Sequence, residues 1–149
     1  MKFRSTKTYG HELGLSACFR QWRAASHCAQ LHGYALAFHF VFEAEELDEN
    51  GWVVDFGGLK SLKDKLVDEF DHRTIVAKDD PQIDKFVELA SLGILDLRIW
   101  SDGVGVERFA RWGLETATEV LKHLQPRVTV VSCEVREHGA NSALCLRGE

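Results

Sequence analysis

One stretch of alternating residues, from Leu31 to Glu46, constrains the fold of this chain more than any other feature. Its large side chains fall on every second position: Tyr34, Leu36, Phe38, Phe40 and Phe42. In a β-strand, residues two apart lie on the same face, so the pattern predicts a long strand with one heavily buried face. We therefore expect a sheet that is covered on one side.

Other segments show the same two-residue period. Part of the segment 3–19 alternates, and we expect it to pair with the long strand as an antiparallel hairpin through the loop 20–30. The segment 127–137 alternates again, and 142–147 is expected to fold back on it as a second hairpin. The sequence thus predicts two pairs of strands.

Between these pairs the period becomes helical. A helix is expected over residues 56–70, with Asp55 placed to cap its first turn. Asp80 and Pro81 predict the start of a short helix that runs to Ala90, and a longer helix is marked by Val106, Phe109, Ala110, Ala117, Val120, Leu121 and Leu124. Since runs of strands are separated by helices, rather than alternating with them, we expect an α+β fold with an antiparallel sheet.

Size and charge limit the class of protein. The 149 residues, 45% of them hydrophobic, suit one domain over 1–149 with its own core. The formal net charge is -5 and the basic residues are scattered, which argues against a nucleic-acid partner. The chain has no 18-residue apolar stretch, and its first seven residues lack the apolar core of a signal peptide, so we expect a cytoplasmic protein without a membrane partner.

Cys28 is the candidate acid–base group among four cysteines. The spacing of the cysteines includes no Cys-x-x-Cys pair, and we treat all four as free thiols. Cys28 falls in the loop before the strand that carries His32, where an imidazole such as that of His27 or His72 could stabilise a thiolate that exchanges protons with a substrate carbon. The alternative is an ordinary loop thiol.

Asp71 and His72 follow the end of the first predicted helix. A carboxylate that fixes the tautomer of an imidazole and raises its basicity suits a proton relay. The alternative is an imidazole that only interacts with the negative end of the helix dipole, beside a solvated aspartate.

Four segments in this order resemble the 6-pyruvoyl-tetrahydropterin synthase and 6-carboxytetrahydropterin synthase family: Cys28 to Tyr34, Trp52 to Phe56, Phe70 to His72, and Val135 to Glu137. The resemblance covers nearly the whole chain. It implies the tunnelling fold, in which antiparallel four-stranded sheets, with helices packed on one face, join edge to edge into barrels. It also implies a homo-oligomer, a hexamer of two trimers, with sites between subunits.

The resemblance assigns roles to four residues. Cys28, with Asp71 and His72, would transfer protons in the side-chain chemistry of 7,8-dihydroneopterin triphosphate. Glu137 would anchor the pterin ring, because one carboxylate can accept hydrogen bonds from a ring N–H and an exocyclic amino group side by side. Without the resemblance, a glutamate at a strand end would be taken as solvated.

The chain departs from the family at the metal. The family holds a catalytic zinc with three histidines, whereas here Phe19 and Tyr34 stand at two of those positions and only His32 remains. A catalytic zinc takes three protein donors, and phenylalanine supplies none, so zinc is doubtful as a cofactor. Other residues near enough in sequence to complete a site are His11, Cys18, His27 and His39.

Two functions therefore stay open. The first is a 6-carboxytetrahydropterin synthase-like lyase in the pathway to queuosine or a related deazapurine. The second is a divergent pterin-binding protein that lacks the zinc-dependent lyase activity.

Overall fold

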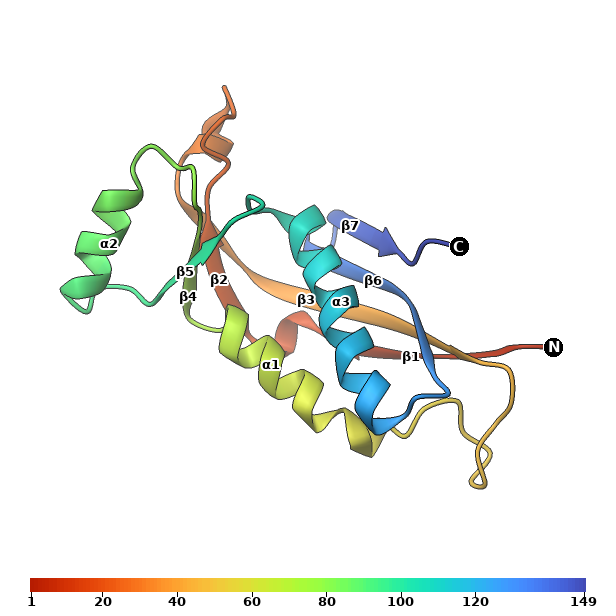
Figure 1. The fold of residues 1–149 in the computed structure, drawn as a ribbon. Coiled ribbons are helices and arrows are strands. Elements are labelled where there is room, and N and C mark those ends of the chain that lie inside the picture. Colours follow the sequence, from red (N-terminus) through yellow and green to blue (C-terminus); the bar gives the residue numbers. More distant parts are fainter.

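A seven-stranded sheet forms the base of the fold in the computed structural model, which describes residues 1–149 (Figure 1). The strands follow the order β5-β4-β2-β3-β6-β7, and β1 also pairs with β3. Their bounds are β1 Phe3–Tyr9, β2 Leu15–Phe19, β3 His32–Ala44, β4 Arg73–Ala77, β5 Leu97–Trp100, β6 Thr129–His138 and β7 Asn141–Leu146.

The first predicted strand is present but interrupted. Both β1 and β2 run antiparallel to β3, β1 beside its second half and β2 beside its first half. A short 3-10 turn, His11–Leu13, separates them, and Gly14 closes the turn with a φ of 73°, a conformation that glycine adopts without strain. The hairpin of β2 with β3 and that of β6 with β7 are both antiparallel, as predicted.

The expected four-stranded, purely antiparallel sheet is wrong in one respect, because two further strands, β4 and β5, extend it. The expected sheet is present as β1 with β2, then β3, β6 and β7, but β4 adds to it parallel to β2 and β5 adds parallel to β4. These two strands contain five and four residues, too few to show a clear period. The α+β class is nevertheless confirmed.

The helices are α1 Lys60–Phe70, α2 Ile83–Ser91 and α3 Val106–Leu124. A 3-10 turn, Phe56–Leu59, leads into α1, and the side chain of Asp55 accepts a hydrogen bond from the backbone N–H of Gly57 at its start. Figure 1 shows α1 and α3 side by side on one face of the sheet, as predicted, with α2 beyond the edge that β4 and β5 form. None of the helices combines the length and the apolar composition needed to cross a bilayer.

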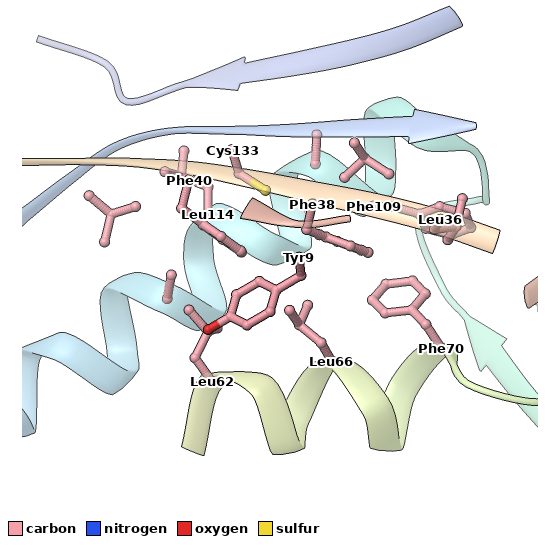
Figure 2. Packing of buried hydrophobic residues seen from close by; sticks show 14 of the residues in the cluster. Tyr9, Leu36, Phe38, Phe40, Leu62, Leu66, Phe70, Phe109, Leu114 and Cys133 are labelled. Atoms are coloured by element: carbon pink, nitrogen blue, oxygen red, sulfur yellow. The ribbon is translucent and has the colours of Figure 1, made fainter. Parts of the chain in front are cut away.

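The core lies between β3 and the two long helices. In Figure 2, Leu62, Leu66 and Phe70 rise from α1, four residues apart, toward the aromatic rings of the sheet. The side chains of Phe38 and Phe70 pack with ring centroids 5.0 Å apart. The predicted buried face of β3 is confirmed, because Leu36, Phe38, Phe40 and Phe42 are all 0% exposed. This core holds β3 in place, and the candidate site lies at the start of β3.

Candidate active site

The turn that carries Cys28 is a 3-10 turn, His27–Ala29, just before β3. The hydroxyl of Ser26 accepts a hydrogen bond from the Cys28 N–H at 3.3 Å, and the Gln21 N–H donates to the Cys28 carbonyl at 2.9 Å. The thiol itself is half-buried and forms no disulfide. Because backbone bonds fix the turn on both sides, Cys28 has a defined position beside the end of β2.

His32 begins β3 directly opposite Phe19. Its Nδ1 lies 2.7 Å from the carbonyl oxygen of Gln30, and since a carbonyl only accepts, Nδ1 carries the proton. The Nε2 atom therefore keeps a lone pair that can accept a proton or bind a metal. The ring centroids of His32 and Phe19 are 5.3 Å apart.

Tyr34 joins this group from the same strand. Its ring centroid lies 6.0 Å from that of Phe19 and 5.5 Å from that of His32. Partial burial and, to a lesser extent, the nearby Glu137 and Cys28 raise the pKa of the Tyr34 hydroxyl. The phenol thus stays protonated at neutral pH.

Glu137 stands near the end of β6, as the sequence predicts, and is half-buried. The pairing of β6 with β3 and the packing of Tyr34 against His138 bring Glu137 to the end of β3 that the Cys28 turn precedes, although the two residues are far apart in the sequence. Local sequence motifs do not indicate this arrangement.

Asp71 and His72 contact each other. The Nδ1 of His72 lies 2.8 Å from Oδ1 of Asp71, so the carboxylate accepts the proton of Nδ1 and leaves Nε2 free. His72 adopts a φ of 58°, unusual for a residue other than glycine, and its N–H donates to the Ser16 carbonyl at 2.7 Å. The His72 side chain is 82% exposed, so the pair faces outward.

Within one chain, the Asp71–His72 pair does not lie beside the Cys28 thiol. The His72 N–H binds the Ser16 carbonyl. The Cys28 carbonyl instead binds the N–H of Gln21, just after β2, and His32 lies opposite Phe19, the last residue of β2. Three residues of a strand span about 10 Å, and β4, which follows His72, lies on the opposite side of β2 from β3, which follows the Cys28 turn. The Asp71–His72 pair and Cys28 are therefore two separate groups within a single chain.

The residues of one chain do not fit a three-donor zinc site. No group of three or more His, Cys, Asp or Glu side chains is placed to hold a metal ion. Phe19, 1% exposed, packs its ring against His32 where a second donor would be needed. Three of the further candidates bind elsewhere: His11 to the Ala35 carbonyl, His39 to the Thr8 hydroxyl, and Cys18 to the Thr74 hydroxyl.

A cavity beside β1 is separate from these groups. It has a volume of about 500 Å³ and is lined by β1 and the loop 47–57, including Trp52 and Phe56. None of the candidate catalytic side chains lines it. The site is therefore defined by its side chains, at the start of β3 and the end of β6, and not by this cavity.

Comparisons with known proteins agree with this architecture. A family model described as 6-pyruvoyl tetrahydropterin synthase matches residues 10–148. A protein of Rickettsia typhi named 6-carboxy-5,6,7,8-tetrahydropterin synthase is 39% identical over 62 residues, which are 41% of this chain and 45% of that protein. A protein of Aquifex aeolicus with the same name is 27% identical over 101 residues, 60% of this chain and 62% of that protein. These matches span less than two thirds of either relative.

Two solved structures share the fold over nearly their whole length. An uncharacterized protein of Wolinella succinogenes is 20% identical with a TM-score of 0.85, over 99% of each chain. The 6-pyruvoyltetrahydropterin synthase of Plasmodium vivax is 16% identical with a TM-score of 0.69, over 100% of this chain and 99% of that one. Fold and family model together define a protein of the pterin synthase class. The chain belongs to the 6-pyruvoyl tetrahydropterin synthase family.

Proposed function

We propose that this protein is a 6-carboxytetrahydropterin synthase-like lyase that acts on 7,8-dihydroneopterin triphosphate. The family membership and the names of the bacterial relatives support this activity. Its place would be the pathway to queuosine or a related deazapurine, in the cytoplasm, where a thiol stays reduced.

The observation that carries the proposal is that the turn of Cys28 leads into β3 and that β3 pairs with β6, so that Tyr34 packs beside His138, the neighbour of Glu137. Glu137 accepts the two neighbouring N–H groups of the pterin ring, and this fork fixes the orientation of the ring. Cys28 then lies beside the substrate side chain, where a thiolate can remove a proton from carbon and return it. The ring anchor and the acid–base group are thus parts of one site.

The Asp71–His72 pair completes this site from a neighbouring subunit of a homohexamer. Two observations support a shared site: the pair is separated from Cys28 within one chain, and the His72 imidazole is exposed with its Nε2 free. The strand β7, at one edge of the sheet, exposes Leu144 and Leu146, which are 55% and 65% exposed. An apolar edge of this kind needs a covering partner.

The second candidate function is a pterin-binding protein without zinc-dependent lyase activity. The packing of Phe19 on His32 favours it, because these residues do not provide three donors for a metal. Any metal that the site holds would then use His32 with a ligand drawn from elsewhere, such as His27 or the substrate.

Metal content and turnover distinguish the two candidates. The protein is purified without added metal or chelator, zinc per chain is measured, and turnover of 7,8-dihydroneopterin triphosphate is followed before and after chelation. Turnover that Cys28→Ala abolishes establishes the lyase. Pterin binding without turnover, in a metal-free protein, establishes the binding protein, and the absence of both contradicts the proposal.

A further inference from the structure

Asp80 is the one carboxylate in the fully buried set of residues, and none of the catalytic roles proposed above uses it. Its side chain is 1% exposed and lies just before α2, at the end of the segment that follows β4. A buried carboxylate costs free energy unless it is paired and hydrogen-bonded. The partners of Asp80 therefore indicate what its position serves.

Arg20 is that partner, sixty residues earlier in the chain. Its Nε donates to one carboxylate oxygen of Asp80 at 2.8 Å and its Nη2 to the other at 2.7 Å, in a two-pronged pair. Asp80 also accepts a hydrogen bond from the Gln82 N–H at 2.8 Å. The hydrogen bonds from Arg20 hold the pKa of the Asp80 carboxyl below its usual range, so the pair is ionised at neutral pH.

The remaining nitrogen of the Arg20 guanidinium, Nη1, contacts the turn His27–Ala29, which contains Cys28 and is called the thiol turn below. The Nη1 atom of Arg20 donates to the Ala29 carbonyl at 3.0 Å, one residue after Cys28. The next residue, Gln21, donates its N–H to the Cys28 carbonyl at 2.9 Å, and its side-chain amide donates to the Val104 carbonyl at 2.9 Å. Two consecutive residues at the end of β2 thus hold two consecutive carbonyls of the turn.

We propose that Asp80 is a positioning residue for Cys28, which it fixes through Arg20 and the Ala29 carbonyl. The inference rests on the proposed function for the role of Cys28 in turnover, but the positioning itself is a property of the chain alone. The Asp80 carboxylate fixes the orientation of the Arg20 guanidinium. The guanidinium in turn fixes the Ala29 carbonyl, and the position of this carbonyl determines where the neighbouring Cys28 thiol points.

The chemistry of the pair favours positioning over simple stabilisation. Buried ion pairs contribute little net stability compared with apolar residues of the same size, whereas their geometry is specific. The planar guanidinium is required because it contacts both oxygens of Asp80 and the Ala29 carbonyl with three differently directed N–H groups. A lysine would keep the charge but not these directions. Arg20 also lines a cavity of about 340 Å³.

The test measures the chemical reactivity of Cys28 in the folded, purified protein, whatever its oligomeric state. Asp80→Asn and Arg20→Lys are alkylated with iodoacetamide, and the rate at Cys28 is divided by the rate at Cys145, a partly buried thiol on β7. A freed turn opens more often, so we expect this ratio to rise by about tenfold in both variants, which corresponds to about 1.4 kcal/mol, the scale of one hydrogen bond.

A core variant separates positioning from general loosening. Leu62→Ala creates a cavity beneath α1, away from the thiol turn, and is expected to lower stability while it leaves the reactivity ratio unchanged. An unchanged ratio in Asp80→Asn and Arg20→Lys overturns the inference, and so does an equal change in Leu62→Ala.

Turnover of 7,8-dihydroneopterin triphosphate by the same variants tests the consequence for function. If the wild-type protein turns over the substrate, kcat falls by about tenfold in Asp80→Asn with KM little changed, because the ring anchor stays in place. A changed reactivity ratio in a protein that has no turnover, even as wild type, supports the positioning role and contradicts the lyase. Unchanged kcat in Asp80→Asn, with active wild type, overturns the inference.

Discussion

Replacing Glu137 with glutamine tests the proposed ring anchor with almost no change in size. An ionised carboxylate accepts both N–H groups of the pterin, whereas a glutamine amide accepts one and turns its own donor toward the other. Losing one charged hydrogen bond costs about 2 kcal/mol. The dissociation constant for a pterin should therefore rise about 30-fold. The substitution keeps the size of a half-buried side chain near the end of β6, so the fold should be unaffected.

Isothermal titration calorimetry with 7,8-dihydroneopterin measures this loss. Glu134→Gln is the matched control: it lies on the same strand, and its carboxylate is bound by the side chains of Arg136 and Ser142. Affinity that is unchanged in Glu137→Gln, while the wild-type protein binds, would refute the anchor. An equal loss in Glu134→Gln would show that the effect comes from the charge of the strand and not from a direct contact.

Three further predictions concern packing, acid stability and the thiols. A Cβ at Gly113 would lie 2.6 Å from Sγ of Cys133, so Gly113→Ala should destabilise the fold by about 1–3 kcal/mol in urea unfolding, and much less in a Cys133→Ala background. The pair with Arg20 lowers the pKa of Asp80 in the folded protein. The stabilisation from this pair is therefore present above the unfolded-state pKa of about 4, and it is lost as the pH falls through the lower pKa of the folded state. Asp80→Asn should therefore flatten the acid limb of a plot of stability against pH, and an unchanged limb would contradict the pairing. Burial holds the pKa of the Cys133 thiol well above its usual range, so iodoacetamide should label Cys28 much faster than Cys133, as peptide mapping by mass spectrometry would show.

The elements with a long, regular period were predictable from the sequence. The alternation in 31–46 corresponds to β3, His32–Ala44, and the helical spacing of 106–124 corresponds to α3, Val106–Leu124. Both elements bury one face against the same core, and burial of one face is what produces a period in the sequence. The prediction of an α+β fold followed from these elements.

The added strands could not be predicted in the same way. All but the first residue of β4, Arg73–Ala77, is buried, so its side chains do not alternate between polar and apolar. Its partner β5, Leu97–Trp100, is only four residues long. Parallel pairing also joins segments that are separated by a helix or a long loop, and no turn motif marks it.

The candidate site was predictable only as separate pieces. Cys28, His32, Asp71, His72 and Glu137 each stand out within a short motif. That Tyr34 would pack beside the end of β6 that carries Glu137, and that Asp71 and His72 would lie apart from Cys28, depends on strand order and register. The pair of Arg20 with Asp80 joins two positions sixty residues apart, and neither position has a local signal for the other.

Mixed oligomers of two inactive variants test the central claim, a site that two subunits share, most directly. Cys28→Ala removes the thiol and His72→Ala removes the relay, so each variant alone should lose turnover of 7,8-dihydroneopterin triphosphate. Co-expression in equal amounts should restore about one quarter of wild-type activity, because one in four subunit contacts then pairs an intact thiol with an intact relay. Mixed oligomers that stay as inactive as the single variants, beside an active wild-type protein, would contradict the shared site.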